Sequence, residues 1–364
     1  MRGNWRQFFV FVTCCLIAFK LGQANNETSR TKRTDNYKDF KQKEIYKESS
    51  LTATKQETDQ VCNMQFIRYI PSTLEQIWIA EIKRVESNER SWKVGCELLN
   101  IELVHVQELV SAVKRYKTEP GSANLASSNT SAHEFRDSCT GMHSLVHIEP
   151  LVSFLRHPLA LCPRSAAPVL DKTYLLVPYK DEVTSDNSKK WLFDAGASTY
   201  DTGAGGASQS WFVKTYRARG IEFDRIIGWE AAKTDPSNQW DSVPADIKRK
   251  TSWFNIPVTT GVGDADNPLT FIKHLTKPED FVVFKLDIDS PLVEIALVKQ
   301  LMTDSQLLEL VDEFYFEHHV SGSPMQWHGW GDLQNSVAEF STLSESYELF
   351  TFLREHGVRA HSWV

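Results

Sequence analysis

Several features that mark other protein classes are missing from this sequence of 364 residues. It has no excess of basic residues, because 40 Lys and Arg stand against 47 Asp and Glu, for a net charge of −7. A basic surface that binds nucleic-acid phosphates is therefore not expected, and we expect no nucleic-acid partner. The sequence has no internal repeat and no C-x-x-C pair. With 41% hydrophobic and 24% charged residues, its composition excludes collagen-like, coiled-coil and wholly disordered chains.

Long hydrophobic runs are also missing after the first 24 residues. Arg2 and Arg6 precede an apolar run over 8–19, and small residues follow as far as Ala24. This run is shorter than the roughly 20 residues that a transmembrane helix needs. The pattern predicts a cleaved signal peptide over 1–24, with a signal anchor as the alternative. We therefore expect a mature chain without a membrane span, either secreted or in the lumen of the secretory pathway.

Cysteines are few, and their number agrees with that location. Loss of Cys14 and Cys15 with the signal peptide leaves four: Cys62, Cys96, Cys139 and Cys162. An even number in an oxidising compartment predicts two disulfides, and three pairings are possible. The wide gaps between these cysteines make a zinc site the weaker interpretation. Sequons at Asn26 and Asn129 predict exposed glycosylation sites.

The rest of the chain divides into three parts by composition. Residues 25–60 are polar and charged, which predicts a disordered stalk. Helical spacing of apolar residues over 73–117 predicts two helices within a helical and irregular, disulfide-stapled region, 61–171, whose role is open. Over 172–364, short apolar runs alternate with helical stretches, which predicts a doubly wound, mostly parallel α/β sheet. The expected strands are 174–178, 191–195, 225–229, 253–258, 281–286, 314–316 and 358–363, and the expected helices are 208–219, 291–302 and 343–356.

Acidic residues and glycines follow the predicted strands at the points where they end. In an open parallel sheet, ligands bind at the carboxyl ends of the strands. Asp194 ends the strand over 191–195 and precedes a turn of small residues that allows close approach of a ligand. Glu230 follows the next strand, where a carboxylate can accept both hydroxyls of a ribose. Asp287 and Asp289 follow a later strand. Together these residues predict a nucleoside-binding crevice.

This order of motifs resembles the fold of the S-adenosylmethionine-dependent methyltransferases. The run over 284–289 is similar to the lysine–acid signature of the FkbM-type methyltransferases, and the resemblance covers residues 172–363. It implies S-adenosyl-L-methionine as the cofactor and a Rossmann-like domain. By this resemblance, the methionine end of the cofactor would contact Asp194, Gly196 and Ala197. Glu230 would hold the ribose, and Asp264 would lie near the adenine.

The resemblance implies O-methyl transfer to a hydroxyl of a glycan or small molecule. The candidate general bases are Asp287, Asp289 and one of two adjacent histidines, His318 and His319. Because side chains alternate along a strand, only one histidine can face the site, and we expect His318. This interpretation assigns no metal ligand. The chain departs from the family in the insert over 199–207 and in having one final strand where an antiparallel hairpin is usual.

Two other functions fit the same residues. Asp287-Ile288-Asp289 is an Asp-x-Asp motif, which many glycosyltransferases use to hold Mn²⁺, with His318 or His319 as a third ligand here. A methyltransferase-like fold can also be kept as a non-catalytic binding module. The acceptor, the oligomeric state and the catalytic competence of the site stay open at the level of sequence.

Overall fold

The computed structural model describes residues 64–118, 129–160, 162, 170–184, 188–202, 208–327, 330, 333 and 339–363. All of these lie within one compact unit, Asp59–Val364. Several predicted features lie outside the described residues: the signal peptide, the stalk, the Asn26 sequon, Cys62 and the glycine-rich run over 203–207.

The first part of the unit contains three helices where the sequence predicted two. They are α1 (Thr73–Glu86), α2 (Ser91–Ile101) and α3 (Leu103–Thr118). Ser72 caps α1 by accepting a hydrogen bond from the Glu75 N–H, as Ser commonly does at this position. The buried side chains of α1 recur at helical spacing: Leu74, Trp78, Ile82 and Val85. This apolar face packs into the core, and α1 also contacts α12 (Leu343–Glu355).

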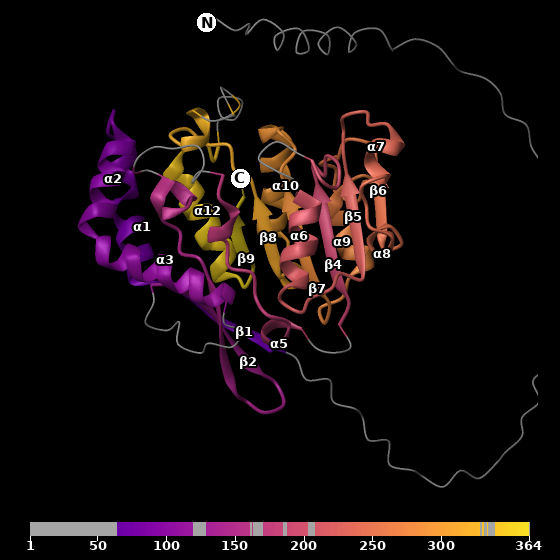
Figure 1. The fold of residues 1–364 in the computed structure, drawn as a ribbon, viewed down its shortest axis with the longest axis horizontal. Coiled ribbons are helices and arrows are strands. Elements are labelled where there is room, and N and C mark those ends of the chain that lie inside the picture. The colour runs from indigo at the N-terminus through magenta and orange to yellow at the C-terminus, as the bar shows by residue number, and fades with distance from the viewer. Residues whose placement is uncertain are drawn as a thin grey trace, which may run out of the picture. The chain divides into compact units, whose positions relative to one another are not determined.

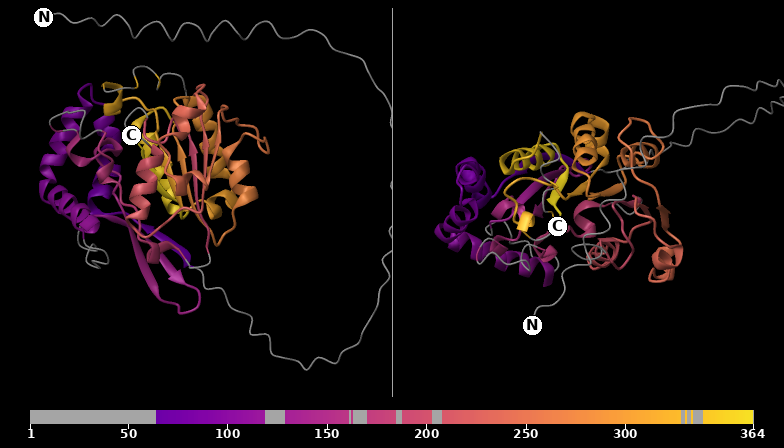
Figure 2. Two further views of the ribbon diagram at one scale, coloured as in Figure 1. Left: turned by 45° about the vertical axis from the view of Figure 1, so that its right-hand side comes forward. Right: turned by 90° about the horizontal axis from the view of Figure 1, so that it is seen from above.

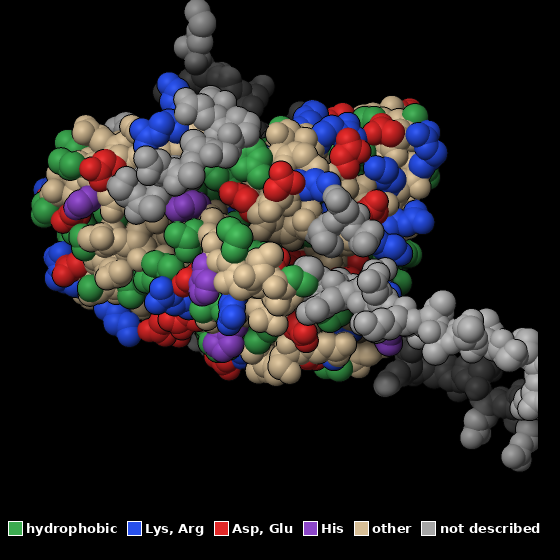
Figure 3. All heavy atoms as spheres, turned by 90° about the horizontal axis from the view of Figure 1, so that it is seen from below, with side chains coloured by type: hydrophobic (Ala, Val, Ile, Leu, Met, Phe, Trp, Pro, Cys, Tyr) green, Lys and Arg blue, Asp and Glu red, His purple; other side chains and the backbone are tan. Residues whose placement is uncertain are grey.

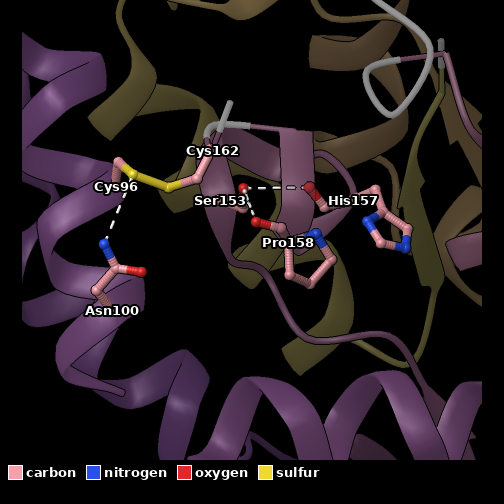
Figure 4. The surroundings of a disulfide bond; sticks show 6 residues. All are labelled: Cys96, Asn100, Ser153, His157, Pro158 and Cys162. Atoms are coloured by element: carbon pink, nitrogen blue, oxygen red, sulfur yellow. Dashed lines mark hydrogen bonds between the residues drawn. A yellow bond between two sulfur atoms is a disulfide. The ribbon is translucent and has the colours of Figure 1, made fainter. Parts of the chain in front are cut away.

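A disulfide links α2 to the segment after a short 3₁₀ helix, η2 (Pro158–Ala160) (Figure 4). It joins Cys96 to Cys162, with the two Cα atoms 5.6 Å apart. Disulfide bonding is thus confirmed for this pair, and Cys139 is disulfide-bonded as well. Asn129 lies within the described residues, where its Nδ2 donates to Glu108, and its glycosylation stays a prediction.

A three-stranded antiparallel sheet was not anticipated in this part of the chain. It has the order β1 (Met64–Ile70), β2 (Ser131–Asp137) and β3 (His143–Ile148). The strand sequences mix charged and apolar residues, and much of β1 is exposed. Partial burial of this kind gives a weak apolar signal, which explains why the sequence pattern did not reveal these strands.

The second part of the unit is a six-stranded sheet in which every neighbouring pair is parallel. Its order is β6-β5-β4-β7-β8-β9, visible side by side in Figure 1. The strands are β4 (Lys190–Ala195), β5 (Arg225–Trp229), β6 (Thr251–Phe254), β7 (Phe281–Leu286), β8 (Glu313–Phe316) and β9 (Arg359–Ser362). The prediction of a parallel α/β sheet is confirmed. The last strand, β9, pairs in parallel with β8.

Helices cover both faces of this sheet. Alternate residues of β4 enter two separate cores: Trp191 and Phe193 pack with α9 and α10, whereas Leu192 packs with α6. Figures 1 and 2 show α1–α3, coloured indigo to purple, beside α12 at the β9 edge. The bounds of these helices are α6 (Ser208–Arg217), α9 (Pro268–Leu275) and α10 (Pro291–Thr303). The shorter helices are η1 (Ser153–Leu155), η3 (Lys172–Tyr174), α5 (Lys180–Val183), α7 (Pro236–Trp240), α8 (Ala245–Lys248), α11 (Ser305–Leu310) and η4 (Pro324–Trp327).

One expected strand, 174–178, is wrong, and the strand expected over 253–258 begins and ends earlier, at Thr251–Phe254. Residues 174–178 are buried but pair with no strand. Side chains hold this segment instead, because the Leu176 N–H donates to Glu149 and the Leu176 carbonyl accepts from Arg359. Continuous apolar runs fit buried coil as well as buried strands when side chains satisfy the backbone.

No helix of the described part of the chain is long and apolar enough to cross a membrane. On the face shown in Figure 3, Lys and Arg side chains are interspersed with Asp and Glu.

Candidate functional site

A cavity of about 670 Å³ opens at the carboxyl ends of the parallel strands. Its size is within the range typical of small-molecule sites. The residues that follow β4, β5, β6, β7 and β8 all contribute to its lining. These lining residues include Gly196, Ser198, Glu230, Ile256, Pro257, Val258, Asp287, Asp289, Ser290 and Glu317.

The cavity lies at the point where the strand order reverses. The chain runs outward from β4 through β5 to β6 and then crosses to β7 on the other side of β4. Adjacent strands whose connections leave in opposite directions form a crevice at their carboxyl ends, where open α/β sheets bind ligands. The position predicted from the strand ends is therefore the position of the cavity.

Gly196 brings the turn after β4 against the end of β7. Its φ of +86° is a left-handed conformation that glycine adopts without strain. A Cβ at this position would lie 1.6 Å from the carbonyl oxygen of Asp287. The backbone hydrogen bond from the Gly196 N–H to the Trp229 carbonyl, 3.0 Å long, ties the same turn to β5. The wall of the cavity thus depends on the absence of a side chain here.

Lys285 joins the acids of two strands beneath the cavity. Its Nζ lies 3.3 Å from Asp194 and 3.1 Å from Asp287, and it donates to the Gly196 carbonyl at 2.6 Å. Burial acts to lower the pKa of Lys285, but the two carboxylates outweigh it and raise the pKa above its usual range. Burial raises the pKa of Asp194, with Lys285 opposing. For Asp287 burial also acts upward, but Lys285 lowers the pKa overall.

Glu230 is held by the backbone and keeps acceptor capacity. Its Oε2 accepts from the Ser198 N–H at 2.8 Å, and its Oε1 accepts from the Ala232 N–H at 2.7 Å. A carboxylate has about four lone-pair positions, so each oxygen can accept another hydrogen bond. Because the side chain is half-buried and lines the cavity, those positions are accessible to a ligand.

A second group of side chains forms where β7 and β8 end. The His319 Nε2 lies 3.6 Å from an oxygen of Asp289 and 3.6 Å from one of Glu317. Its other ring nitrogen contacts the buried Glu294 at 3.0 Å. Burial and the neighbouring Asp287 raise the pKa of Glu317 to about 8. Burial lowers the pKa of His319, but Asp289 and Glu294 outweigh it and raise the pKa to about 10.

The structure separates the predicted site residues into two sets. Gly196, Glu230, Asp287 and Asp289 line the cavity together. The others lie elsewhere. Asp194 is fully buried and accepts from Ser208 at 3.1 Å, below the cavity.

Two more residues implied by the resemblance lie outside the lining. Ala197 is fully buried, and its N–H donates to the Trp229 carbonyl. Asp264 lies in the turn after β6, where its N–H donates to the Gly261 carbonyl, and it is not among the described residues that line the cavity. Direct contact of either with a ligand in the cavity is therefore not supported.

The expectation that His318 faces the site is corrected by its contacts. The His318 Nδ1 is 2.8 Å from the Ser346 hydroxyl of α12, and the His318 ring stacks on Phe316. Burial lowers the pKa of His318 to about 3, so it is neutral at physiological pH. The histidine near Asp289 and Glu317 is His319.

Sequence reasoning also missed the roles of Glu317 and Glu294. Glu317 directly follows β8, two residues before His319, and the two side chains approach to 3.6 Å. That spacing of two residues could have indicated from the sequence that Glu317 and His319 belong to the same site. Glu294 lies in the first turn of α10 and reaches His319 across 25 residues, a contact that no local pattern encodes.

The charged side chains that line the cavity are all acidic. Four of its lining residues carry carboxyl groups, Glu230, Asp287, Asp289 and Glu317, and only Glu317, with its pKa raised to about 8, holds a proton near neutral pH. Among the described lining residues there is no Lys, Arg or His. Lys285 lies below and is neutralised by its two carboxylates. The cavity therefore favours a cationic ligand over an anionic one.

Comparison with protein-family models, with curated proteins and with solved structures finds no match for this chain, so the chemistry of the cavity is the basis for assigning a function.

Proposed function

We propose that this protein is an S-adenosylmethionine-dependent methyltransferase that transfers a methyl group to a hydroxyl oxygen of a glycan or small molecule. The observation that carries the proposal is an acidic cavity at the switch point of a parallel sheet, with Glu230 presenting free acceptor positions. When bound, S-adenosylmethionine supplies an electrophilic methyl group on a positively charged sulfur.

The residues of the cavity fit the parts of such a cofactor. Glu230 would accept hydrogen bonds from the two ribose hydroxyls, since the backbone fixes its orientation. The apolar Ile256 and Val258 after β6 would contact the adenine ring. Asp287 and Asp289 would face the sulfonium and ammonium charges, which an acidic wall stabilises.

The chain's contribution to the reaction would be mainly positioning and proton transfer. Methyl transfer breaks the sulfur–carbon bond and forms a carbon–oxygen bond in line with it, so the walls must align the acceptor oxygen with the methyl carbon. The acceptor hydroxyl loses its proton, and a carboxylate in the cavity can take it. Asp289 lines the cavity with an exposed side chain, whereas Asp287 is held by Lys285. We therefore assign proton uptake to Asp289 and charge stabilisation to Asp287.

A metal-dependent glycosyltransferase is the second candidate because Asp289 of the Asp-x-Asp motif lies near His319. Its donor, a sugar nucleotide, carries a diphosphate that an acidic cavity repels unless a cation intervenes. Asp287, the other acid of the motif, is engaged by Lys285 and by the Trp363 Nε1, 3.2 Å away. Because Lys285 and Trp363 already engage Asp287, only one carboxylate of the motif is available to a metal, which favours methyl transfer.

The test is calorimetric titration of the purified protein with S-adenosylhomocysteine, the demethylated product. We expect saturable binding that falls roughly tenfold to hundredfold in Glu230→Gln, because hydrogen bonds to a charged acceptor contribute about 1.5–3 kcal/mol. Glu355→Gln, at an exposed position away from the cavity, is the matched control and should bind as the wild type does.

Two outcomes would overturn the proposal. Binding of a uridine-diphosphate sugar in the presence of Mn²⁺, without binding of S-adenosylhomocysteine, would favour the glycosyltransferase. Absence of binding to any of these ligands by the folded protein would favour a non-catalytic module.

A further inference from the structure

Asp289, Glu317 and His319 form a cluster with the composition of a metal site. One ligand atom from each residue lies within 4.8 Å of the others. The two carboxylates and one imidazole come from the ends of adjacent strands, β7 and β8. From this geometry we propose that these three side chains bind a divalent cation at the base of the cavity.

The strongest support is the unsatisfied nitrogen of His319. Its ring is fully buried, and its Nε2 has no hydrogen-bond partner among the residues that the structure describes. Leaving a buried polar atom without a partner costs roughly 1–3 kcal/mol. The distances of 3.6 Å to Asp289 and Glu317 are too long for hydrogen bonds but suit atoms that share an ion. The nitrogen is thus directed at the centre of the cluster.

Neighbouring side chains orient the ligands as they do in metal sites. Glu294 accepts from the Nδ1 of His319 at 3.0 Å, so in the unprotonated ring, the form that binds a metal, the lone pair is on Nε2, which faces the two acids. Glu294 is itself fixed by the Ile288 N–H at 2.9 Å. On the other side, the Trp330 Nε1 donates to Glu317 Oε1 at 2.8 Å and leaves Oε2 facing His319. A carboxylate behind a ligating histidine is the usual outer support of such a site.

The remaining ligand, Asp289, can complete the cluster without moving the fold. Its side chain is 67% exposed, whereas those of His319 and Glu317 are buried. Its φ of +52° is a left-handed conformation, which Asp and Asn tolerate better than most residues. Its oxygen already lies within 4.8 Å of the other two ligand atoms, and the exposed side chain has room to rotate.

The donor set selects the class of ion. Carboxylate oxygens suit hard ions, imidazole suits transition metals, and a mixed set without sulfur fits Mn²⁺, Fe²⁺ or Zn²⁺. Three protein ligands leave coordination positions open, and two of the three, Asp289 and Glu317, line the cavity. An ion there, held by one oxygen of Asp289, would polarise an acceptor hydroxyl and ease transfer of its proton to the other oxygen. That consequence rests on the proposed methyl transfer, but the cation site itself does not.

The experiment is titration of the chelator-treated, full-length protein with Mn²⁺ and separately with Zn²⁺, Mg²⁺ and Ca²⁺, without nucleoside ligand. We expect one saturable site that prefers Mn²⁺ or Zn²⁺ and is weakened at least tenfold in Asp289→Asn. The exposed position and the tolerance of Asn for a positive φ make this variant compatible with folding. Asp241→Asn, an exposed acid outside the cluster, is the matched control and should bind as the wild type does.

Electron paramagnetic resonance of bound Mn²⁺ tests the nitrogen ligand directly. The wild type should show coupling to a histidine nitrogen that is lost in His319→Gln, whose fold is checked by its cooperative unfolding. Three results would overturn the proposal: no saturable binding, equal affinity in Asp289→Asn, or binding without nitrogen coupling. Because no S-adenosylhomocysteine is present, these results are separate from those that test methyl transfer.

Discussion

Lys285 determines the geometry of the cavity floor through contacts with two strands. Its Nζ forms ion pairs with Asp194 of the neighbouring strand, β4, and with Asp287, which follows it by two residues in the sequence. It also donates to the Gly196 carbonyl, which places the turn after β4. Burying three charges is unfavourable unless they are paired, and removing one partner of a buried pair typically costs about 3–5 kcal/mol. The lysine–acid pattern therefore has a structural role, which is to hold the floor of the cavity in place.

At the same scale, Gly196→Ala should be far more destabilising than Gly263→Ala. Both glycines have a positive φ, +86° and +83°, so both variants incur the left-handed strain of about 1–2 kcal/mol. Only at Gly196 would the new Cβ meet backbone, 1.6 Å from the Asp287 oxygen, whereas nothing lies within 4 Å of the one at Gly263. Urea unfolding should show the extra loss, and S-adenosylhomocysteine affinity should fall only in Gly196→Ala. Equal losses in both variants would contradict the close approach.

Elements differ in how they are held in place. The parallel strands pair through backbone ladders, whereas the segment near η2 is attached to α2 by the Cys96–Cys162 disulfide (Figure 4). Ser153 also donates to the carbonyls of His157 and Pro158 within that segment. A crosslink between distant segments restricts the unfolded chain more than the folded one.

The double variant Cys96→Ala, Cys162→Ala should therefore lower the unfolding free energy by about 2–4 kcal/mol. The sequence separation of 66 residues puts the entropic effect near the upper end of that range. Asn100→Ala is the control, because it removes a 3.9 Å contact to the Cys96 sulfur but keeps the crosslink. Guanidinium unfolding measures both. A double variant as stable as the control would show that the disulfide contributes little.

On the scale of the whole molecule, two buried arginines tie the amino-terminal part to the sheet. Arg354 of α12 donates to the Tyr69 hydroxyl and to the Glu149 carbonyl, each at 2.9 Å. Arg359 of β9 pairs with Glu313 at 2.8 Å and donates to the carbonyls of β3. The sequence divides the chain near residue 172 into a helical part and an α/β part. Each part thus supplies hydrogen-bond partners for buried polar groups of the other.

A chain that starts at residue 172 should consequently fail to fold cooperatively. It would lack the partners that Arg354 takes from Tyr69 and Glu149, and unpaired buried charges are strongly destabilising. A chain that starts at residue 59, the beginning of the compact unit, is the control and should keep a sharp unfolding transition. Circular dichroism during heating compares them. Cooperative unfolding of the shorter chain would show that the α/β part is an independent domain.

The amino-acid sequence by itself determined the parallel sheet and the edge at which the cavity lies. Strands such as β7 are covered on both faces, so their apolar runs are continuous and can be recognised in the sequence. Because the strands are parallel, the acids that follow them lie at the same edge of the sheet. Glu230 and Asp287 could be placed on that basis alone. The strands β1–β3 mix charged and apolar residues and are only partly buried, so they carry no such signal.

Only the tertiary structure decided which of these groups face the cavity. Asp194 lies beneath it because Lys285 and Ser208 occupy its carboxylate, contacts that span 91 and 14 residues. Ser346 of α12 holds His318, and His319 is the histidine that lies near Asp289 and Glu317. Such outcomes depend on packing between elements far apart in the sequence, and no local spacing encodes them.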